Sequence, residues 1–283
     1  MFDNDNIQRF LFDKHNVRGE IIHLETVLKL INAKHNYPIV IKSLLSEALL
    51  CSLLMSSTLK FSGQLTLQFQ SKKAITLLLI KCNHLFQTRA LVHFDDKATN
   101  KDYLDALTDG ALVVTIESDN KVKPYQSVVP LKGSIRQSIE HYFEQSEQLP
   151  TRFFLTSNST NAAGIMLQRM PEDERLDACT TDSWQHLLSL AKTITPEELL
   201  TLGNEDLLYR LFHKEECRLF QGHQIQFKCP CSKARMLETI KLVGEVDAMD
   251  LLKKNKAIKI QCEFCLENYA FEKNDVLYLF HNQ

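Results

Sequence analysis

The chain has 283 residues, of which 44% are hydrophobic and 24% are charged. This composition is typical of a folded globular protein with room for one large core and an appended module, and it excludes an intrinsically disordered chain. The formal net charge of −2 argues against broad nucleic-acid binding, which needs a basic surface.

Strand and helix signals alternate over residues 1 to about 175 without a regular rhythm. Apolar residues that alternate or run together predict strands at Val17–Leu24, Leu65–Phe69, Ile75–Ile80 and Ala111–Ile116. Helical spacing predicts helices at Thr26–Ala33 and Ile39–Leu59, and Ser134 can cap a third helix that carries Ile135, Ile139, Tyr142 and Phe143. An irregular mixture of this kind predicts an α+β fold.

No targeting or membrane segment is predicted. The first five residues are acidic and polar, whereas a secretory signal is basic and then apolar. The most apolar stretch, Leu44–Leu54, contains Ser46, Glu47 and Ser52 and is too short to span a bilayer. We therefore expect a cytoplasmic protein without a membrane partner. Thiols stay reduced at rest in the cytoplasm, so clustered cysteines there favour metal or redox chemistry.

The composition changes near Pro171, and Pro171–Asp182 is a plausible boundary because it is polar and acid-rich. A first helix is predicted to place Trp184, Leu187, Leu188 and Ala191 on one face. A second begins with a capping box formed by Thr195 and Glu198, with Pro196 in its first turn. Leu207, Leu208, Leu211 and Phe212 then recur at helical spacing. These helices have little bulk of their own, so we expect them to pack onto the N-terminal domain.

The last segment, from about Phe227 to Gln283, contains further short elements. Helices are predicted at Lys233–Leu242 and Val246–Lys254, a strand at Ala257–Gln261 and its hairpin partner at Tyr269–Phe271. Asn274 is expected to cap a short terminal helix. The predicted organisation is an α+β domain over residues 1–178, a helical linker over 179–226 and a small α+β module over 227–283.

Two close cysteine pairs lie in this module: Cys229 and Cys231 in Cys-Pro-Cys, and Cys262 and Cys265 in Cys-Glu-Phe-Cys. If a fold brings the pairs together, four thiolates provide a tetrahedral site for zinc. The same pairs can instead close into two short disulfides. A site that accepts either metal or disulfides is a candidate redox switch.

Three other interpretations of these cysteines remain open. They can be four ordinary reduced thiols. They can belong to a nucleic-acid-binding zinc ribbon, although residues 228–283 carry nine Lys and Arg against eight Asp and Glu and so lack a basic face. They can serve a thioredoxin-like oxidoreductase, although that motif begins a helix, whereas Cys262 and Cys265 follow a predicted strand. No Ser-His-Asp set, phosphate loop or paired carboxylates favour another enzyme.

Energies favour unfolding when zinc is exchanged for disulfides. A module of about 55 residues has a marginal core. Structural zinc contributes on the order of 10–16 kcal/mol in comparable modules. A disulfide across three or four residues constrains the unfolded chain by only about 2 kcal/mol. We therefore predict that oxidation unfolds the C-terminal module.

Motifs at both ends of the chain carry a resemblance to a known family. The C-terminal motifs are Phe227–Ser232, Cys262–Cys265 and Tyr269–Phe271. The N-terminal motifs are Arg9–Phe12, Val17–Glu20, Leu44–Ala48, Thr58–Phe61, Tyr142–Phe143 and Ser146–Arg152. With these motifs the chain resembles the redox-regulated heat-shock chaperonins, which are bacterial ATP-independent holdases and not enzymes.

The resemblance implies a mechanism. The reduced protein would bind one zinc ion per chain through Cys229, Cys231, Cys262 and Cys265 and would be inactive. Peroxide or hypochlorous acid would form the disulfides Cys229–Cys231 and Cys262–Cys265, release zinc, unfold the module and loosen the linker. The active form would be a homodimer whose exposed apolar surface binds unfolding client proteins and not nucleic acid.

The linker helices, the other four cysteines and two histidines carry further expectations. The apolar faces of the linker helices are either permanent core or the cover of a client-binding surface, and we favour the cover because of the resemblance. Cys51 and Cys82 lie in apolar stretches, where buried free cysteine is common. Cys179 and Cys217 border the linker helices, and a redox role for them stays open. His213 and His223 are expected at the surface or in packing, not as ligands.

Overall fold

Contacts divide the chain into two units, Met1–Phe227 and Lys228–Gln283. The computed structural model describes residues 4–59, 62–119, 123–171 and 181–281. The predicted boundary between residues 178 and 179 lies outside these ranges, so the three-part organisation stays a prediction. Strands and helices mix in both units, which confirms the α+β class.

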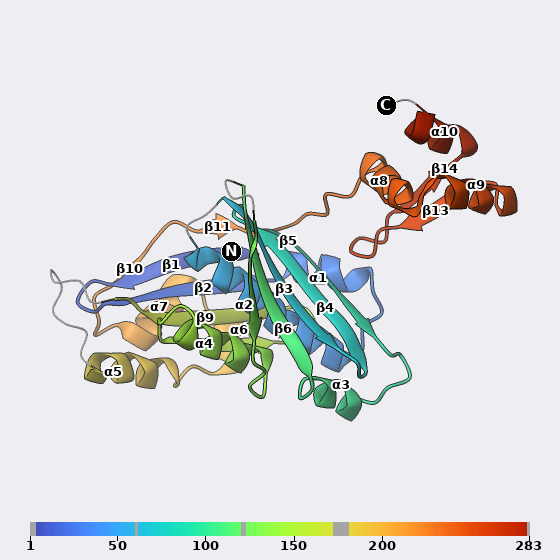
Figure 1. The fold of residues 1–283 in the computed structure, drawn as a ribbon. Helices are drawn as coiled ribbons and strands as arrows, with labels where there is room; N and C mark the ends of the chain where they lie inside the picture. The colour runs from blue at the N-terminus through green and yellow to red at the C-terminus, as the bar shows by residue number, and fades with distance from the viewer. Residues whose placement is uncertain (1–3, 60–61, 120–122, 172–180, 282–283) are drawn as a thin grey trace. The chain divides into compact units, whose positions relative to one another are not determined.

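The first unit contains two six-stranded sheets (Figure 1). In the first sheet the order is β10-β1-β2-β9-β8, and β11 also pairs with β1. Its strands are β1 (Asn6–Phe12), β2 (Val17–Leu24), β8 (Thr151–Ser157), β9 (Ala162–Arg169), β10 (Cys217–Leu219) and β11 (His223–Gln224). All pairs in this sheet are antiparallel, and β2 pairs along its whole length with β9, from Val17 opposite Arg169 to Leu24 opposite Ala162.

The second sheet has the order β12-β5-β4-β3-β6-β7. Its strands are β3 (Gly63–Ser71), β4 (Ile75–Asn83), β5 (Gln87–Phe94), β6 (Gly110–Ser118), β7 (Tyr125–Val129) and β12 (Gln226–Phe227). In β3 the predicted alternation is confirmed, because Leu65, Leu67 and Phe69 are fully buried on the inner face of the sheet. The short β12 pairs in parallel with β5, although the two strands lie far apart in the sequence.

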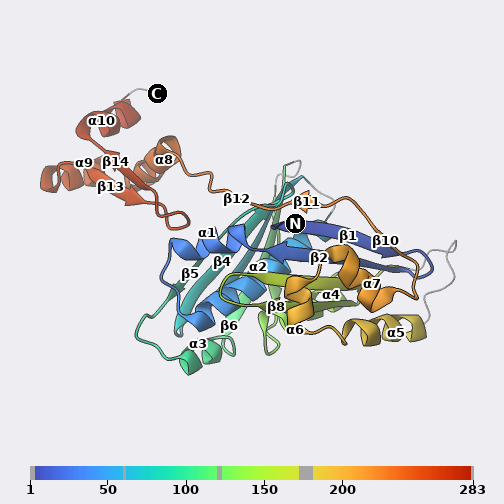
Figure 2. The same ribbon diagram turned by 180° about the vertical axis from the view of Figure 1, so that it is seen from behind.

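Helix α2 (Ile39–Thr58) lies between the two sheets and carries the centre of the main core (Figure 2). It is apolar on nearly all sides, which is the pattern of a helix surrounded by protein. By length and composition alone it is the one described helix that could cross a membrane, but 72% of its most apolar window is buried inside the protein. A core helix passes the same test, so this is weak support for a membrane span.

Three further helices complete the main core of the first unit. They are α1 (Thr26–Ala33), α3 (Asn100–Ala106) and α4 (Ile135–Gln145). The hydroxyl of Ser134 accepts a hydrogen bond from the Gln137 amide and caps α4, as the sequence predicts.

Helices α5 (Thr181–Ala191), α6 (Pro196–Thr201) and α7 (Asn204–Phe212) cover the other face of the first sheet. Their apolar side chains form a second core with residues of β1, β2 and β9, and we call the buried sheet residues the covered face: Phe10, Phe12, Val17, Ile21, Ala163, Ile165 and Leu167. The predicted capping box at Thr195 and Glu198 is present. The sequence therefore predicted that this region packs onto the N-terminal domain. It predicted two helices, whereas the structure has three, because extended Leu202 and Gly203 separate α6 from α7.

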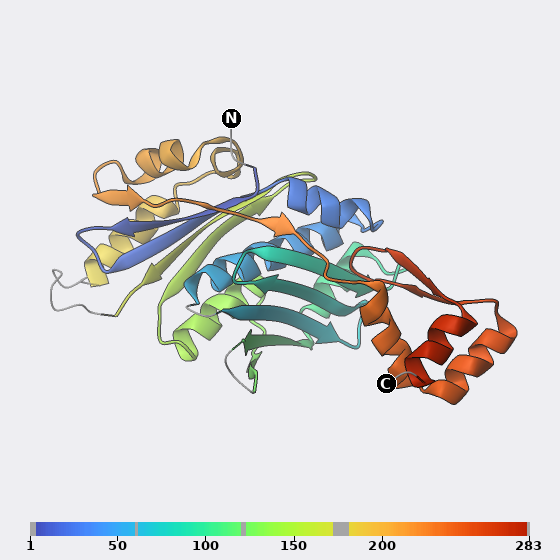
Figure 3. The ribbon, with the colours of Figure 1, turned by 90° about the horizontal axis from the view of Figure 1, so that it is seen from above.

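Residues 217–227, which we call the strap, connect these helices to the second unit. Figure 3 shows this segment running from the edge of the first sheet to the edge of the second. Its strands β10 and β11 pair with β1, and β12 then pairs with β5. The sequence did not predict these three strands, because they are two or three residues long and have no apolar period.

The second unit has a small core of its own. It contains α8 (Lys233–Val243), α9 (Glu245–Lys254), the antiparallel hairpin β13 (Ile258–Gln261) and β14 (Asn268–Phe271), and α10 (Lys273–His281). Among the described residues, its buried apolar cluster is Ile240, Ala248, Phe271 and Val276, and nine partly buried apolar side chains pack against this cluster. The prediction that Asn274 caps α10 is wrong: the helix begins at Lys273, and the Asp275 carboxylate accepts a hydrogen bond from the Glu272 amide instead.

Candidate metal centre

The four cysteines reach one point from two loops of the second unit. Cys229 and Cys231 lie just before α8, whose first turn is capped by Ser232. Cys262 and Cys265 lie in the turn between β13 and β14. The Cys262 carbonyl accepts a hydrogen bond from the Leu266 amide, and Leu266 has a positive φ of 55°. This tight turn directs both of its sulfur atoms to the same side.

The sulfur atoms have the spacing of a four-thiolate metal site. All four Sγ atoms lie within 4.8 Å of one another. Cys229 Sγ is 3.5 Å from Cys262 Sγ, and Cys231 Sγ is 3.3 Å from Cys265 Sγ. Four sulfurs that each lie about 2.3 Å from zinc in a tetrahedron are about 3.8 Å apart. The arrangement therefore fits a tetrahedral ion such as zinc.

Thiol ionisation in this cluster is unequal. Burial raises the pKa values of Cys229 and Cys265. Burial also opposes ionisation of Cys231, but hydrogen bonds to its sulfur, first of all from the Tyr269 hydroxyl at 3.2 Å, lower its pKa below the usual value. Four neighbouring thiolates repel one another, so full ionisation needs a cation among them.

Tyr269 is a site residue that the sequence did not predict. The sequence indicated only that it lies in a hairpin strand. The signal that could have found it is the hydroxyl, because a tyrosine that packs against apolar residues usually directs its hydroxyl to a hydrogen-bond partner.

The remaining cysteines and the two nearby histidines lie elsewhere. Cys51 and Cys82 are fully buried in the first unit, and burial raises their pKa values. Burial also raises the pKa of Cys217, in β10, to about 12. Cys179 lies outside the described residues. His213 follows α7, and the ring of His223 packs against Phe86, so neither joins the four sulfurs.

Comparisons with known proteins agree with one another over nearly the whole chain. The family model described as Hsp33 protein matches residues 5–272. The chain belongs to the Hsp33 family. A 33 kDa chaperonin of Pseudomonas aeruginosa is 40% identical over 99% of this chain and 96% of its own length. A 33 kDa chaperonin of Nitrosococcus oceani is 36% identical over 100% of this chain and 96% of its own length.

The fold has a solved counterpart. The crystal structure of a 33 kDa chaperonin from Thermotoga maritima, a heat shock protein 33 homologue, matches with a TM-score of 0.81. It is 20% identical, and the match covers 98% of each chain. Membership of the Hsp33 family makes this protein a chaperone, which binds unfolded client proteins, and not an enzyme.

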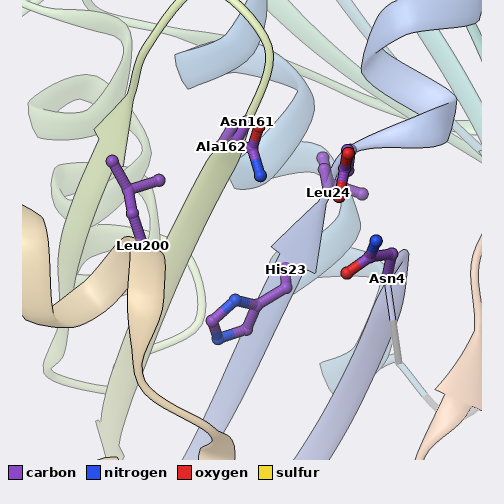
Figure 4. Close-up of a pocket in the computed structure, with 7 residues that line it drawn as sticks. Asn4, His23, Leu24, Asn161, Ala162 and Leu200 are labelled. Atoms are coloured by element: carbon purple, nitrogen blue, oxygen red, sulfur yellow. The ribbon is translucent and has the colours of Figure 1, made fainter. Parts of the chain in front are cut away.

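A pocket of about 340 Å³ lies beside the covered face of this Hsp33-family chain (Figure 4). It is lined by His23 at the end of β2, by Leu200 of α6 and by residues at the start of β1 and β9. The His23 Nε2 atom is buried without a hydrogen-bond partner. Burial lowers the pKa of His23, and a hydrogen bond with Asn204 of α7 opposes this shift only in part.

This burial predicts that acid loosens the helices over the covered face. Histidine in an unfolded chain has a pKa of about 6.5, and the lowered pKa in the folded state means that the unfolded chain binds more protons. Stability should therefore be complete above about pH 6.5 and fall as the pH drops towards the folded-state pKa, by at most about 1.4 kcal/mol per pH unit within that window. His23→Gln should remove this part of the pH dependence. Emission of Trp184, the single tryptophan, reports whether α5 stays packed.

The control for this prediction is His93→Gln, at an exposed position of β5. The difference between the stability–pH profiles of His23→Gln and the parent isolates the contribution of His23 from those of the other titrating groups. Glu215 is one of these: burial alone would raise its pKa, but hydrogen bonds from His15 and His186 lower it below 4.5, so its contribution is lost only in stronger acid. A His23→Gln profile identical to that of the parent would contradict the prediction.

Proposed function

We propose that this chain is a redox-regulated holdase. Reduced, it binds one zinc ion through Cys229, Cys231, Cys262 and Cys265 and is inactive. Oxidation forms the disulfides Cys229–Cys231 and Cys262–Cys265 and releases the ion. The active form is a cytoplasmic homodimer that binds unfolding proteins and prevents their aggregation, with no nucleic-acid or membrane partner.

The observation that carries this proposal is the convergence of four sulfur atoms in a small unit with few fully buried apolar side chains. Within the described part of the second unit, four apolar residues are buried and nine partly buried apolar side chains pack against them. Such a core stabilises a small module by no more than about 3–5 kcal/mol. Because structural zinc contributes on the order of 10–16 kcal/mol, the fold of this unit depends on the ion.

The proposed disulfide pairing has a physical consequence. The folded unit brings Cys229 Sγ to 3.5 Å from Cys262 Sγ and Cys231 Sγ to 3.3 Å from Cys265 Sγ, pairs that are 33 and 34 positions apart. Bonds across such long loops would stabilise the fold by about 4 kcal/mol each in the chain-entropy model and would keep the unit together. The two local bonds constrain the unfolded chain far less. Only the local pairing makes oxidation a release switch.

The covered face is the proposed client-binding surface. It carries large apolar side chains, among them Phe10, Phe12 and Ile21, each no more than 2% exposed while α5, α6 and α7 lie over it. An apolar face of this size is a binding surface once it is uncovered. In this proposal residues 1–178 form the chaperone core, residues 179–226 the releasable linker and residues 227–283 the redox switch.

A titration with oxidant tests the proposal. Peroxide is added to the reduced, zinc-loaded chain under mild heat, and released zinc, Trp184 emission and light scattering by an aggregating client are recorded together. We expect release of one zinc ion per chain, a red shift of the emission as Trp184 leaves the second core, and loss of client scattering in the same range of oxidant. Peptide mapping should recover the two local disulfides.

The matched control is the same titration on a chain carrying Cys217→Ser, which should behave like the parent. Equal suppression of aggregation by the reduced and oxidised chains would rule out redox regulation. Recovery of Cys229–Cys262 and Cys231–Cys265 disulfides in an active protein would rule out the proposed pairing.

A further inference from the structure

The strap closes one edge of each sheet in the first unit. Strands β10 and β11 cover the free edge of β1, and β12 covers the free edge of β5. Without the strap, both edges would present rows of unpaired backbone donors and acceptors, which readily pair with another extended chain.

The strap is held mainly through its backbone. The amide of Phe220 donates to the Arg9 carbonyl at 2.9 Å, the amide of Ile225 to the Asp5 carbonyl at 2.7 Å, and the amide of Gln226 to the Phe86 carbonyl at 3.1 Å. Most of its side chains, including those of β11, are exposed. Main-chain hydrogen bonds of this kind do not depend on sequence, which is how proteins accept varied peptides as added strands.

A single deep anchor accompanies this ladder. Ile225 is 2% exposed and belongs to the main core, and Phe227 packs beside that core. Between Leu219, opposite Phe10, and His223, opposite Ile7, the register shifts by one residue. Because Ile225 is buried in the main core, displacement of the strap would leave a sheet edge with a pocket for one branched apolar side chain.

The strap has the features of a segment that opens easily. Its three strands have two or three residues each and are mostly exposed or half-buried. Short, exposed ladders with few buried apolar contacts open at low free-energy cost. Its last residue, Phe227, lies two positions before Cys229, so unfolding of the switch begins beside it.

We propose that the strap occupies the place of a client segment. When it is displaced, the edges of β1 and β5 and the Ile225 pocket bind an extended, apolar segment of an unfolding protein by strand addition. This inference rests on the proposed holdase function and adds a second, backbone-directed contact to the covered face. The strap sequence itself indicates the fitting client chemistry: an extended run with an isoleucine-like anchor and little net charge.

A labelled peptide of residues 217–227 carrying Cys217→Ser provides the probe. We expect its fluorescence anisotropy to rise with the oxidised full chain and not with the reduced parent, whose own strap competes at high effective concentration. A reduced full chain carrying Gln226→Pro lacks the amide that donates to Phe86, and it should bind the peptide without oxidation. Gln226→Ala, which keeps that amide, should behave like the reduced parent.

Modified peptides test the mode of binding without altering the protein. Methylation of the Ile225 amide nitrogen, or Ile225→Asp, should weaken binding at least about tenfold. An unlabelled client kept unfolded should displace the parent peptide. Equal binding of parent and methylated peptides would overturn strand addition, as would a Gln226→Pro chain that pairs with a second copy and takes no peptide.

The test separates the two proposals. An oxidised chain that suppresses client aggregation but does not bind the peptide overturns the strand-addition inference and leaves the holdase function standing. A chain that binds the peptide only after oxidation, and whose bound peptide is displaced by client, supports both.

Discussion

Replacing Cys265 with serine should abolish the fold of the second unit even under reducing conditions. The Cys265→Ser chain keeps three of the four metal-site thiols. Loss of the fourth ligand removes most of the roughly 10–16 kcal/mol that structural zinc contributes. The remaining apolar core, about 3–5 kcal/mol at most, cannot hold about 55 residues together. We expect zinc content to fall from about one ion per chain towards zero. Limited proteolysis should remove residues 228–283 and leave the first unit intact.

Cys217→Ser is the matched control, because Cys217 lies in β10 and not among the four sulfurs. It should keep its zinc and its protease-resistant second unit. Persistence of a protected, zinc-free second unit in Cys265→Ser would show that the apolar cluster alone is sufficient and would remove the energetic basis of the proposed switch.

Phe212→Ala should switch on client binding without oxidation. Phe212 ends α7, is 1% exposed, and its ring lies 5.0 Å from that of Phe12 on the covered face. Truncation of such a side chain lowers the free energy of unfolding by about 3–5 kcal/mol, and here the loss weakens the packing of three short helices. The reduced, zinc-loaded variant should show red-shifted Trp184 emission and suppress client aggregation.

The control lies on the same helix. Tyr209 is 73% exposed, so Tyr209→Ala changes α7 without uncovering the sheet and should leave the reduced chain inactive. Zinc content must be equal in both variants, which separates loss of the helical cover from loss of the ion. If Phe212→Ala loosens the helices and the reduced chain still fails to bind clients, the covered face is not the client-binding surface.

Local sequence signals predicted much of this structure because they act over a few residues. The Thr195 capping box and the apolar alternation of β3 are each complete within short windows, and both occur as predicted. The two cysteine pairs are also short motifs, and the fold brings their sulfur atoms together. The Asn274 cap was wrong because α10 begins at Lys273, so Asn274 lies inside the first turn, where the Asp275 carboxylate accepts a hydrogen bond from the Glu272 amide.

Long-range pairing explains what the sequence could not show. The strap pairs with β1 across more than two hundred residues, and neither partner reveals the other in its own pattern. The sequence placed Tyr269 in a hairpin strand, and only the folded turn shows that its hydroxyl meets Cys231. The position of Ile225 in the main core likewise depends on the tertiary fold.

The segment that connects β12 to Cys229 is very short. Lys228 alone separates Phe227, the last paired residue of the sheet, from Cys229. Unfolding of the second unit therefore acts directly on the last hydrogen-bonded residues of β12. A few flexible residues inserted after Lys228 would uncouple the two units, so that metal loss and loosening of the sheet edge become independent events.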